Sequence, residues 1–301
     1  MREAFGVSVL WNHATGVFGV TRQNAAMADH VEPRRWNCRA EPQKVMVLER
    51  ERMGAVFPDV LEGSRGIGRT CARLAAERGF AVALSYRSNA AAAADVVAHI
   101  EGTGGKAISV RCEVATEGDV QRLFDAAAER LGSVTGVVNN AGIVAPSLPL
   151  AELSVERMKR VFDVNVLGAY LVARQAARVL SRSRGGQGGS LVNVSSVASR
   201  LGSPNEYVDY AGSKAAVDTL TLGLAKELAA DGVRVNAVRP GLIDTDIHES
   251  GGQPGRAQRL GRLTPLGRAG TADEAARAIV WLLSDEASYV TGTLLDVAGG
   301  R

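Results

Sequence analysis

Cysteine and histidine are scarce in this chain of 301 residues. The three cysteines, Cys38, Cys71 and Cys112, are widely separated and odd in number, and the four histidines are scattered. No Cys-x-x-Cys pair occurs, so the sequence argues against a disulfide framework and against a bound metal. Free thiols are typical of a reducing compartment, and we expect a cytoplasmic protein.

An excess of one charge and a long apolar run are also missing. The 35 basic and 32 acidic residues leave a net charge of +3, and no basic stripe is interleaved with aromatic residues. We therefore expect no nucleic-acid partner. No apolar run reaches the length of a membrane span, so we expect no membrane partner either. With 46% apolar and 22% charged residues, the composition suits a globular domain with a sizeable core.

The first 52 residues differ from the rest. They hold two of the three tryptophans and two of the four histidines, without a sustained period of 2 or 3.6 residues. We expect residues 1–52 to be a poorly ordered or spurious extension, with a partner-binding extension as the alternative. Residues 53–301 are expected to form one dinucleotide-binding catalytic domain.

Strands and helices alternate along the rest of the chain. Short apolar runs predict strands at residues 81–85, 107–112, 134–139, 190–195, 233–238 and 293–297. Helical patterns lie between them, at residues 69–78, 89–101, 117–131, 155–180, 209–230 and 272–284. This alternation predicts an α/β fold with a doubly wound, mainly parallel sheet, helices on both faces and ligands at the carboxyl ends of the strands.

A tyrosine and a lysine stand one helical turn apart. Tyr210 and Lys214 share a face of the predicted helix at 209–230, in a chain with only five residues of each type. A nearby ammonium favours the phenolate and lowers the pKa of the tyrosine, which can then exchange a proton with a carbonyl or alcohol oxygen. The alternative is a coincidental pair on a solvated face. The competing Tyr207 has Ala211, not a lysine, one turn further on.

A glycine-rich turn precedes the predicted helix at 69–78. Gly66 and Gly68 carry no Cβ, so backbone amides and the positive helix end can approach a pyrophosphate. The alternative is a tight loop without function. The expected phosphate-binding residues are Gly63, Ser64, Arg65, Gly66, Ile67 and Gly68.

The residues after the second predicted strand bear on the choice of cofactor. An acid about 20 residues beyond the turn would hold the ribose of NAD, but no Asp or Glu occurs between Glu77 and Asp95. Arg87 and Ser88 follow the strand instead. Arg87, together with Arg65, can pair with a 2′-phosphate, so NADP is favoured over NAD. The alternative is a pair of solvated arginines.

Taken together, these motifs resemble the short-chain dehydrogenase/reductase family. The matching residues are 63–68, Asn139-Asn140-Ala141-Gly142, Asn165, Ser196, Tyr210, Lys214 and Pro240-Gly241, in that order within residues 60–301. The resemblance implies a Rossmann-type sheet of about seven strands, a nicotinamide dinucleotide and a homodimer or homotetramer. It implies interconversion of a ketone and a secondary alcohol on a small molecule, as in the 3-oxoacyl-reductase and sugar-dehydrogenase branch.

The resemblance also assigns roles to single residues. Ser196, rather than Ser195 or Ser199, would hold the substrate oxygen, Tyr210 would be the acid/base, and Lys214 would tune it and hold the nicotinamide ribose. Asn165 would distort its helix and order a water that relays protons. Residues 246–262 are expected to form a mobile lid over the substrate. Further cofactor contacts are expected at Glu113, Val114, Asn139, Ala141, Gly142, Pro240, Gly241, Ile243 and Thr245.

The chain departs from the family before Gly63. Leu61-Glu62 stand where Thr-Gly is expected, which puts an anion beside the phosphates. The segment at 55–60 carries Pro58, which cannot donate to a central strand ladder, so residues 45–48 are the alternative first strand. A catalytically silent dinucleotide-binding protein is the alternative function.

Overall fold

The computed structural model describes residues 8–12, 17–21, 44–48, 66–245 and 252–301. The chain divides into two units, Met1–Glu41 and Pro42–Arg301. In the first unit, β1 (Ser8–Asn12) and β2 (Val17–Thr21) form an antiparallel pair in which Ser8 lies opposite Thr21. The sequence pattern did not predict this pair.

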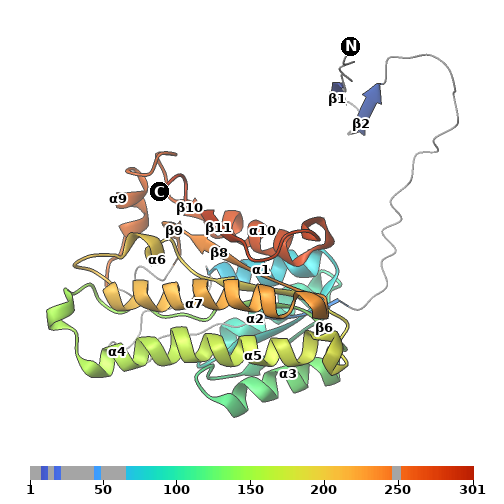
Figure 1. Ribbon diagram of the computed structural model, residues 1–301, viewed down its shortest axis with the longest axis horizontal. Coiled ribbons are helices and arrows are strands. Elements are labelled where there is room, and N and C mark those ends of the chain that lie inside the picture. Colours follow the sequence, from blue (N-terminus) through green and yellow to red (C-terminus); the bar gives the residue numbers. More distant parts are fainter. Residues whose placement is uncertain (1–7, 13–16, 22–43, 49–65, 246–251) are drawn as a thin grey trace, which may run out of the picture. The chain divides into compact units, whose positions relative to one another are not determined.

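The second unit is built on a seven-stranded sheet (Figure 1). The strand order is β11-β8-β7-β6-β3-β4-β5, and every neighbouring pair is parallel. The doubly wound sheet of about seven strands is therefore confirmed. The strands are β3 (Lys44–Leu48), β4 (Phe80–Tyr86), β5 (Ala107–Arg111), β6 (Val134–Asn139), β7 (Gly189–Val194), β8 (Val233–Pro240) and β11 (Leu294–Val297).

The central strand comes from the segment that we assigned to the extension. Val47 of β3 pairs with Ala83 of β4 and with Val137 of β6, and its side chain is fully buried. The alternative first strand at 45–48 is thus the one in the sheet, because a proline-free apolar run can pair on both edges. The compact unit therefore begins before Met53, and the proline-containing segment 55–60 lies outside the described residues.

Side chains of successive strand residues point to opposite faces of the sheet and pack in two separate cores. Met46, Val138 and Val192 pack in the core beneath α1, α2 and α10, whereas Val47, Val137 and Leu191 pack in the core beneath α3, α5 and α7. The helices of the first core are α1 (Ile67–Glu77), α2 (Ala90–Gly102) and α10 (Ala272–Leu283). Those of the second are α3 (Glu117–Leu131), α5 (Ala169–Leu180) and α7 (Val208–Glu227).

The single helix predicted at 155–180 is divided into three parts. α4 (Val155–Phe162) runs into the π-helical segment η2 (Asp163–Gly168), which continues as α5. These parts lie end to end beside α7 (Figure 1). A π-helical turn holds an extra residue and re-aims the side chains on it, which concerns Asn165 here.

Short elements complete the carboxyl edge of the sheet and its connections. α6 (Ala198–Leu201) follows β7, and β9 (Ile243–Asp244) pairs with β10 (Gly270–Thr271). Of the predicted lid, residues 246–251 lie outside the described residues, and α9 (Arg256–Gly261) follows. Among the described residues no helix is both long and apolar enough to cross a bilayer. The remaining 3₁₀ turns are η1 (Leu150–Glu152), η3 (Arg182–Arg184), η4 (Ala229–Asp231) and η5 (Asp285–Ala287).

Candidate active site

Lys214 points from α7 to the carboxyl end of β7. Its side chain is buried, and its Nζ atom donates a hydrogen bond to the carbonyl oxygen of Val194 at 2.9 Å. A Cβ atom on Gly142 would lie 3.0 Å from the same Nζ atom. A strand end and a residue without a side chain therefore set the position of the ammonium.

Tyr210 lies one turn before Lys214, as the spacing predicts. The Nζ atom of Lys214 is 5.8 Å from the centre of the Tyr210 ring. The hydroxyl of Ser196 hydrogen-bonds the phenol, and its Oγ atom accepts a hydrogen bond from the backbone N–H of Ala198 at 3.1 Å. The structure thus brings together the three side chains that were predicted from positions 196, 210 and 214.

The neighbouring serines are engaged elsewhere. Ser195 donates its hydroxyl to the backbone carbonyl of Lys214 at 3.1 Å. The Ser199 hydroxyl lies 2.8 Å from the backbone oxygen of Ser196. Of the three candidate serines, Ser196 is the one that contacts the phenol, which supports its selection.

Burial controls the protonation of both groups. Burial raises the pKa of Tyr210, and the hydrogen bond from Ser196 opposes that shift. Burial also lowers the pKa of Lys214 to about 8, against the charge of Asp218, which raises it. The expected lowering of the pKa of Tyr210 is therefore wrong for the described residues, because burial of the phenol, which disfavours the charged phenolate, is the largest cause of the shift.

Asn165 is buried inside the protein and does not face solvent. Its Oδ1 atom accepts from the backbone N–H of Ile143 at 2.7 Å, and its Nδ2 atom donates to the carbonyl of Ile143 at 2.9 Å. Nδ2 also donates to Ser213 at 3.0 Å, and Ser213 donates to the carbonyl of Tyr210 at 2.7 Å. The π-helical turn therefore connects the loop after β6 to the helix that carries Tyr210. A water relay at Asn165 stays a prediction.

Asn139 has an internal role that the sequence did not show. Its side-chain amide donates to the carbonyl of Ala169 at 2.9 Å and to the Oδ1 atom of Asn193 at 3.0 Å. Asn193 donates in turn to Thr221 at 2.9 Å. The side chain of Asn139 thus joins β6 and β7 to α5, and its contact with a cofactor stays a prediction, as does that of the buried Ala141 beside it.

The start of α1 suits a phosphate. Gly66 is the N-cap residue, no side chain of the described residues forms a cap hydrogen bond, and no acidic residue occupies the first turn of the helix. The N–H groups in the first turn of a helix have no partner within the helix and can hold an anion. Ile67 and Gly68 form the first turn, while Gly63, Ser64 and Arg65, together with Leu61 and Glu62, lie outside the described residues.

Arg87 and Glu113 form an ion pair across neighbouring strand ends. The Nε atom of Arg87 lies 2.8 Å from Oε2 of Glu113, and Nη1 of Arg160 lies 3.9 Å from the same oxygen. Ser88 beside Arg87 is exposed, whereas Val114 beside Glu113 is fully buried. Arg87 and Glu113 were predicted as separate cofactor contacts, because no local sequence pattern indicates that they pair.

The predicted loop after β8 packs against the C-terminal strand. The backbone N–H of Gly241 donates to Val297 at 3.0 Å, and a Cβ at Gly241 would lie 2.8 Å from the Cα of Ala298. The carbonyl of Pro240 accepts from Val197 at 3.1 Å, which joins this loop to the turn that carries Ser196. Ile243 is buried in β9 and Thr245 is half-buried.

The described residues fit a dinucleotide on three observations. The N-terminus of α1 begins at Gly66 with no cap hydrogen bond from a described side chain. Gly142 leaves space beside Lys214 that a Cβ would fill. The Oε1 atom of Glu113 is buried and has no hydrogen-bond partner within the part of the chain that the structure describes, so it can accept a donor from a ligand. In that same part, no three metal-binding side chains gather as a metal site would need.

A second group of interacting side chains lies beside the proposed acid/base, and no motif in the sequence predicted it. Arg256 on α9 donates to both carboxylate oxygens of Glu206, at 2.8 and 2.5 Å, and lies 5.2 Å from the centre of the Tyr207 ring. The partners are 50 residues apart in sequence, so no local pattern pairs them. They join the segment after residue 251 to the start of α7, three residues before Tyr210.

Comparisons with known proteins agree with this geometry. A family model described as enoyl-(acyl carrier protein) reductase matches residues 62–301. The chain is 50% identical over 242 residues to the uncharacterized oxidoreductase YgfF of Escherichia coli, covering 80% of this chain and 98% of that protein. It is 41% identical over 243 residues to 3beta-hydroxysteroid dehydrogenase 1 of Eggerthella lenta, covering 80% and 91%. The crystal structure of a short-chain type dehydrogenase/reductase from Mycobacterium marinum superimposes with a TM-score of 0.75 at 33% identity, over 85% of this chain and 94% of that one.

Proposed function

The chain belongs to the short-chain dehydrogenase/reductase family of nicotinamide-dependent oxidoreductases, and from this premise we propose that it interconverts a ketone and a secondary alcohol with NADP. The observation that carries the proposal is the convergence of Ser196, Tyr210 and Lys214 at the carboxyl end of β7. A phenol that hydrogen-bonds a serine, with an ammonium 5.8 Å from its ring, is equipped to move a proton at a substrate oxygen.

The three side chains divide the work. In the reductive direction Tyr210 donates its proton to the carbonyl oxygen as that oxygen gains negative charge, and Ser196 donates a hydrogen bond to the same oxygen. The positive charge of Lys214 stabilises the phenolate that results. A bound nicotinamide dinucleotide supplies the hydride.

Asn165 supports the site from behind. Its three hydrogen bonds, to both backbone groups of Ile143 and to Ser213, hold the loop after β6 against α7. We assign to it the ordering of a water that returns a proton through Lys214 to Tyr210.

The preference for NADP rests on Arg87. No acid stands between Glu77 and Asp95 to receive the ribose hydroxyls of NAD. Arg87 brings a guanidinium to the end of β4, where its Nε atom lies 2.8 Å from Oε2 of Glu113, and a guanidinium is a group that can pair with a phosphate. The residues that would hold the dinucleotide are those predicted above, including Gly63, Ser64 and Arg65.

The substrate is proposed as a 3-oxoacyl thioester or a sugar or polyol, with simple aliphatic and steroid alcohols still open. We also propose a cytoplasmic homodimer or homotetramer. Exposed apolar side chains on α4, η2, α5 and α7 support association through those helices. They are Phe162, Leu167, Tyr170 and Leu222, which are between 41% and 47% exposed.

The test is oxidation of NADPH and NADH by the chain as given and by Glu62→Gly, with a panel of ketones that represents each substrate class. We expect turnover with NADPH in at least one of the two proteins and a loss of at least about a hundredfold in Tyr210→Phe. Binding of NADPH without turnover of any ketone supports the catalytically silent alternative. Full activity in Tyr210→Phe contradicts the mechanism.

A further inference from the structure

Asp218 lies one helical turn beyond Lys214 on α7, and only 9% of it is exposed. Its Oδ2 atom lies 2.6 Å from the hydroxyl of Ser199 and 3.5 Å from Nη1 of Arg239. Its Oδ1 atom is buried and has no hydrogen-bond partner among residues 66–245 and 252–301, in which the site lies. A carboxylate this buried and this incompletely bonded is costly, so it calls for an explanation.

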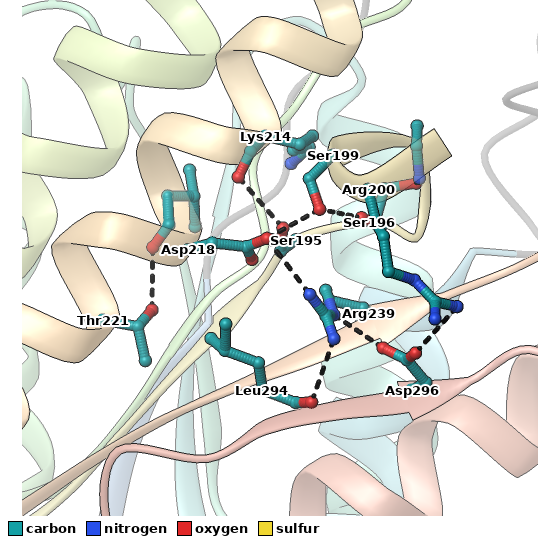
Figure 2. Close-up of polar contacts among 12 residues, drawn as sticks. Ser195, Ser196, Ser199, Arg200, Lys214, Asp218, Thr221, Arg239, Leu294 and Asp296 are labelled. Carbon is teal, nitrogen blue, oxygen red and sulfur yellow. Dashed lines mark hydrogen bonds and ion pairs between the residues drawn. The ribbon is translucent and has the colours of Figure 1, made fainter. Parts of the chain in front are cut away.

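Asp218 reaches Ser196 through a single side chain. The Ser199 hydroxyl can donate its single proton to Oδ2 of Asp218 at 2.6 Å, and Ser199 lies three residues after Ser196 on the same turn, with its Oγ atom 2.8 Å from the backbone oxygen of Ser196. Figure 2 shows this line of contacts running from α7 to the turn at the start of α6. A buried carboxylate therefore anchors the turn that carries the Ser196 hydroxyl.

Asp218 also acts on Lys214 by charge. On its own helix Lys214 faces the phenol of Tyr210 and this carboxylate. The groups that other described elements bring to it, the Val194 carbonyl and Gly142, are uncharged. Burial lowers the pKa of Lys214, and Asp218 opposes that shift.

The far side of Asp218 does not cancel this charge. Arg239 is closer to Asp296, with Nε to Oδ1 at 2.6 Å, than to Asp218 at 3.5 Å. Asp296 also pairs with Arg200 at 3.2 Å. Charges thus alternate outward from Lys214, as Figure 2 shows, and Arg239 is neutralised mainly by Asp296.

We propose that Asp218 is a positioning residue for proton transfer at Tyr210, because it keeps the Lys214 ammonium charged and holds the Ser196 turn through Ser199. This inference rests on the proposed function, in which Tyr210, Lys214 and Ser196 do the chemistry. Asp218 itself touches neither substrate nor cofactor in this scheme.

The test begins with Asp218→Asn, which keeps an acceptor for Ser199 and removes the charge. We expect the basic limb of the plot of kcat against pH to move to lower pH. At pH 8.5 the ratio of kcat to its optimum is then expected to be roughly threefold lower in the variant than in the wild type. The matched control Asp125→Asn removes an exposed carboxylate on α3, outside this chain of charges, and leaves the limb in place. Ser199→Ala lowers kcat but does not move the limb, since the charge of Asp218 remains.

A second readout does not depend on turnover. The chain has five lysines, so the ¹³Cε resonance of Lys214 can be assigned as the one missing from Lys214→Met. Its titration midpoint is expected to fall in Asp218→Asn and to stay unchanged in Asp125→Asn. Should Asp218→Asn not fold, Asp218→Ser serves in its place.

The two proposals fail in different ways. Absence of ketone turnover in both the chain as given and Glu62→Gly overturns the proposed function, while the Lys214 titration still tests the charge effect of Asp218. The inference is overturned if folded Asp218→Asn keeps the activity of the wild type and if neither its pH profile nor its Lys214 midpoint changes.

Discussion

A Cβ atom placed on Gly142 would come within 3.0 Å of the Nζ atom of Lys214, although the two residues are 72 positions apart in sequence. The glycine near the start of the loop after β6 therefore leaves the space that the ammonium occupies. A side chain there has to displace either the loop or the amine, and the amine is tied to Val194.

The first prediction concerns this contact. Gly142→Ala is expected to lower kcat roughly tenfold by moving Lys214 away from Tyr210, with a loss of stability of only about 1 kcal/mol. The control is Gly118→Ala in the exposed first turn of α3, where the nearest atom to a new Cβ is 3.6 Å away. That control is expected to keep full activity and gain about 0.5–1 kcal/mol. Steady-state kinetics measure kcat of both variants, and urea unfolding measures their stability.

The second prediction concerns the protonation of Lys214. Its pKa in the folded protein, about 8, lies below the ordinary value of 10.5. Between these values the unfolded chain binds more protons than the folded one, so the contribution of Lys214 to stability rises with pH from about 8 to 10.5. Relative to Lys214→Met, the wild type is expected to gain roughly 2–3 kcal/mol between pH 7 and pH 10.

Urea unfolding of the wild type and Lys214→Met at several pH values measures this difference, and other titrating groups cancel between the two proteins. A gap in stability that does not change with pH would contradict the assigned burial of the ammonium. The variant is expected to be inactive at every pH.

The third prediction concerns the contact between α9 and the start of α7. Arg256→Met removes a buried guanidinium from Glu206 and Tyr207. We expect KM to rise roughly tenfold with kcat within about threefold, because the contact holds a segment beside the site without touching the reacting atoms. Arg262→Met, on an exposed arginine just beyond α9, serves as the control. Equal falls in kcat and kcat/KM would instead place Arg256 in the chemical step.

The fourth prediction concerns the choice of cofactor. Arg87→Met removes the guanidinium at the end of β4 and leaves Glu113 without its 2.8 Å partner. We expect the Kd of NADPH to rise roughly tenfold or more, and that of NADH to change little or to fall. Quenching of intrinsic fluorescence by each dinucleotide measures both constants on the same sample. An equal loss for both dinucleotides would remove Arg87 from the recognition of the 2′-phosphate.

Local pattern was enough for the fold class and for most elements. The alternation of apolar runs with helical periods predicted the parallel sheet, and the helix at 117–131 matches α3 at both ends. The four-residue spacing of Tyr210 and Lys214 placed them on one face, because one turn of helix brings such residues together whatever surrounds them.

Distant packing decided the rest. The choice of residues 45–48 over 55–60 as the first strand, the π-helical turn at Asn165 and the Arg256–Glu206 contact all depend on partners far along the chain. Sequence alone placed an ammonium near a phenol, yet the direction of the Tyr210 pKa shift is set by burial. Periodicity and helical spacing are short-range properties that a few neighbouring residues carry, whereas desolvation and ion pairing depend on which distant elements fold against a side chain.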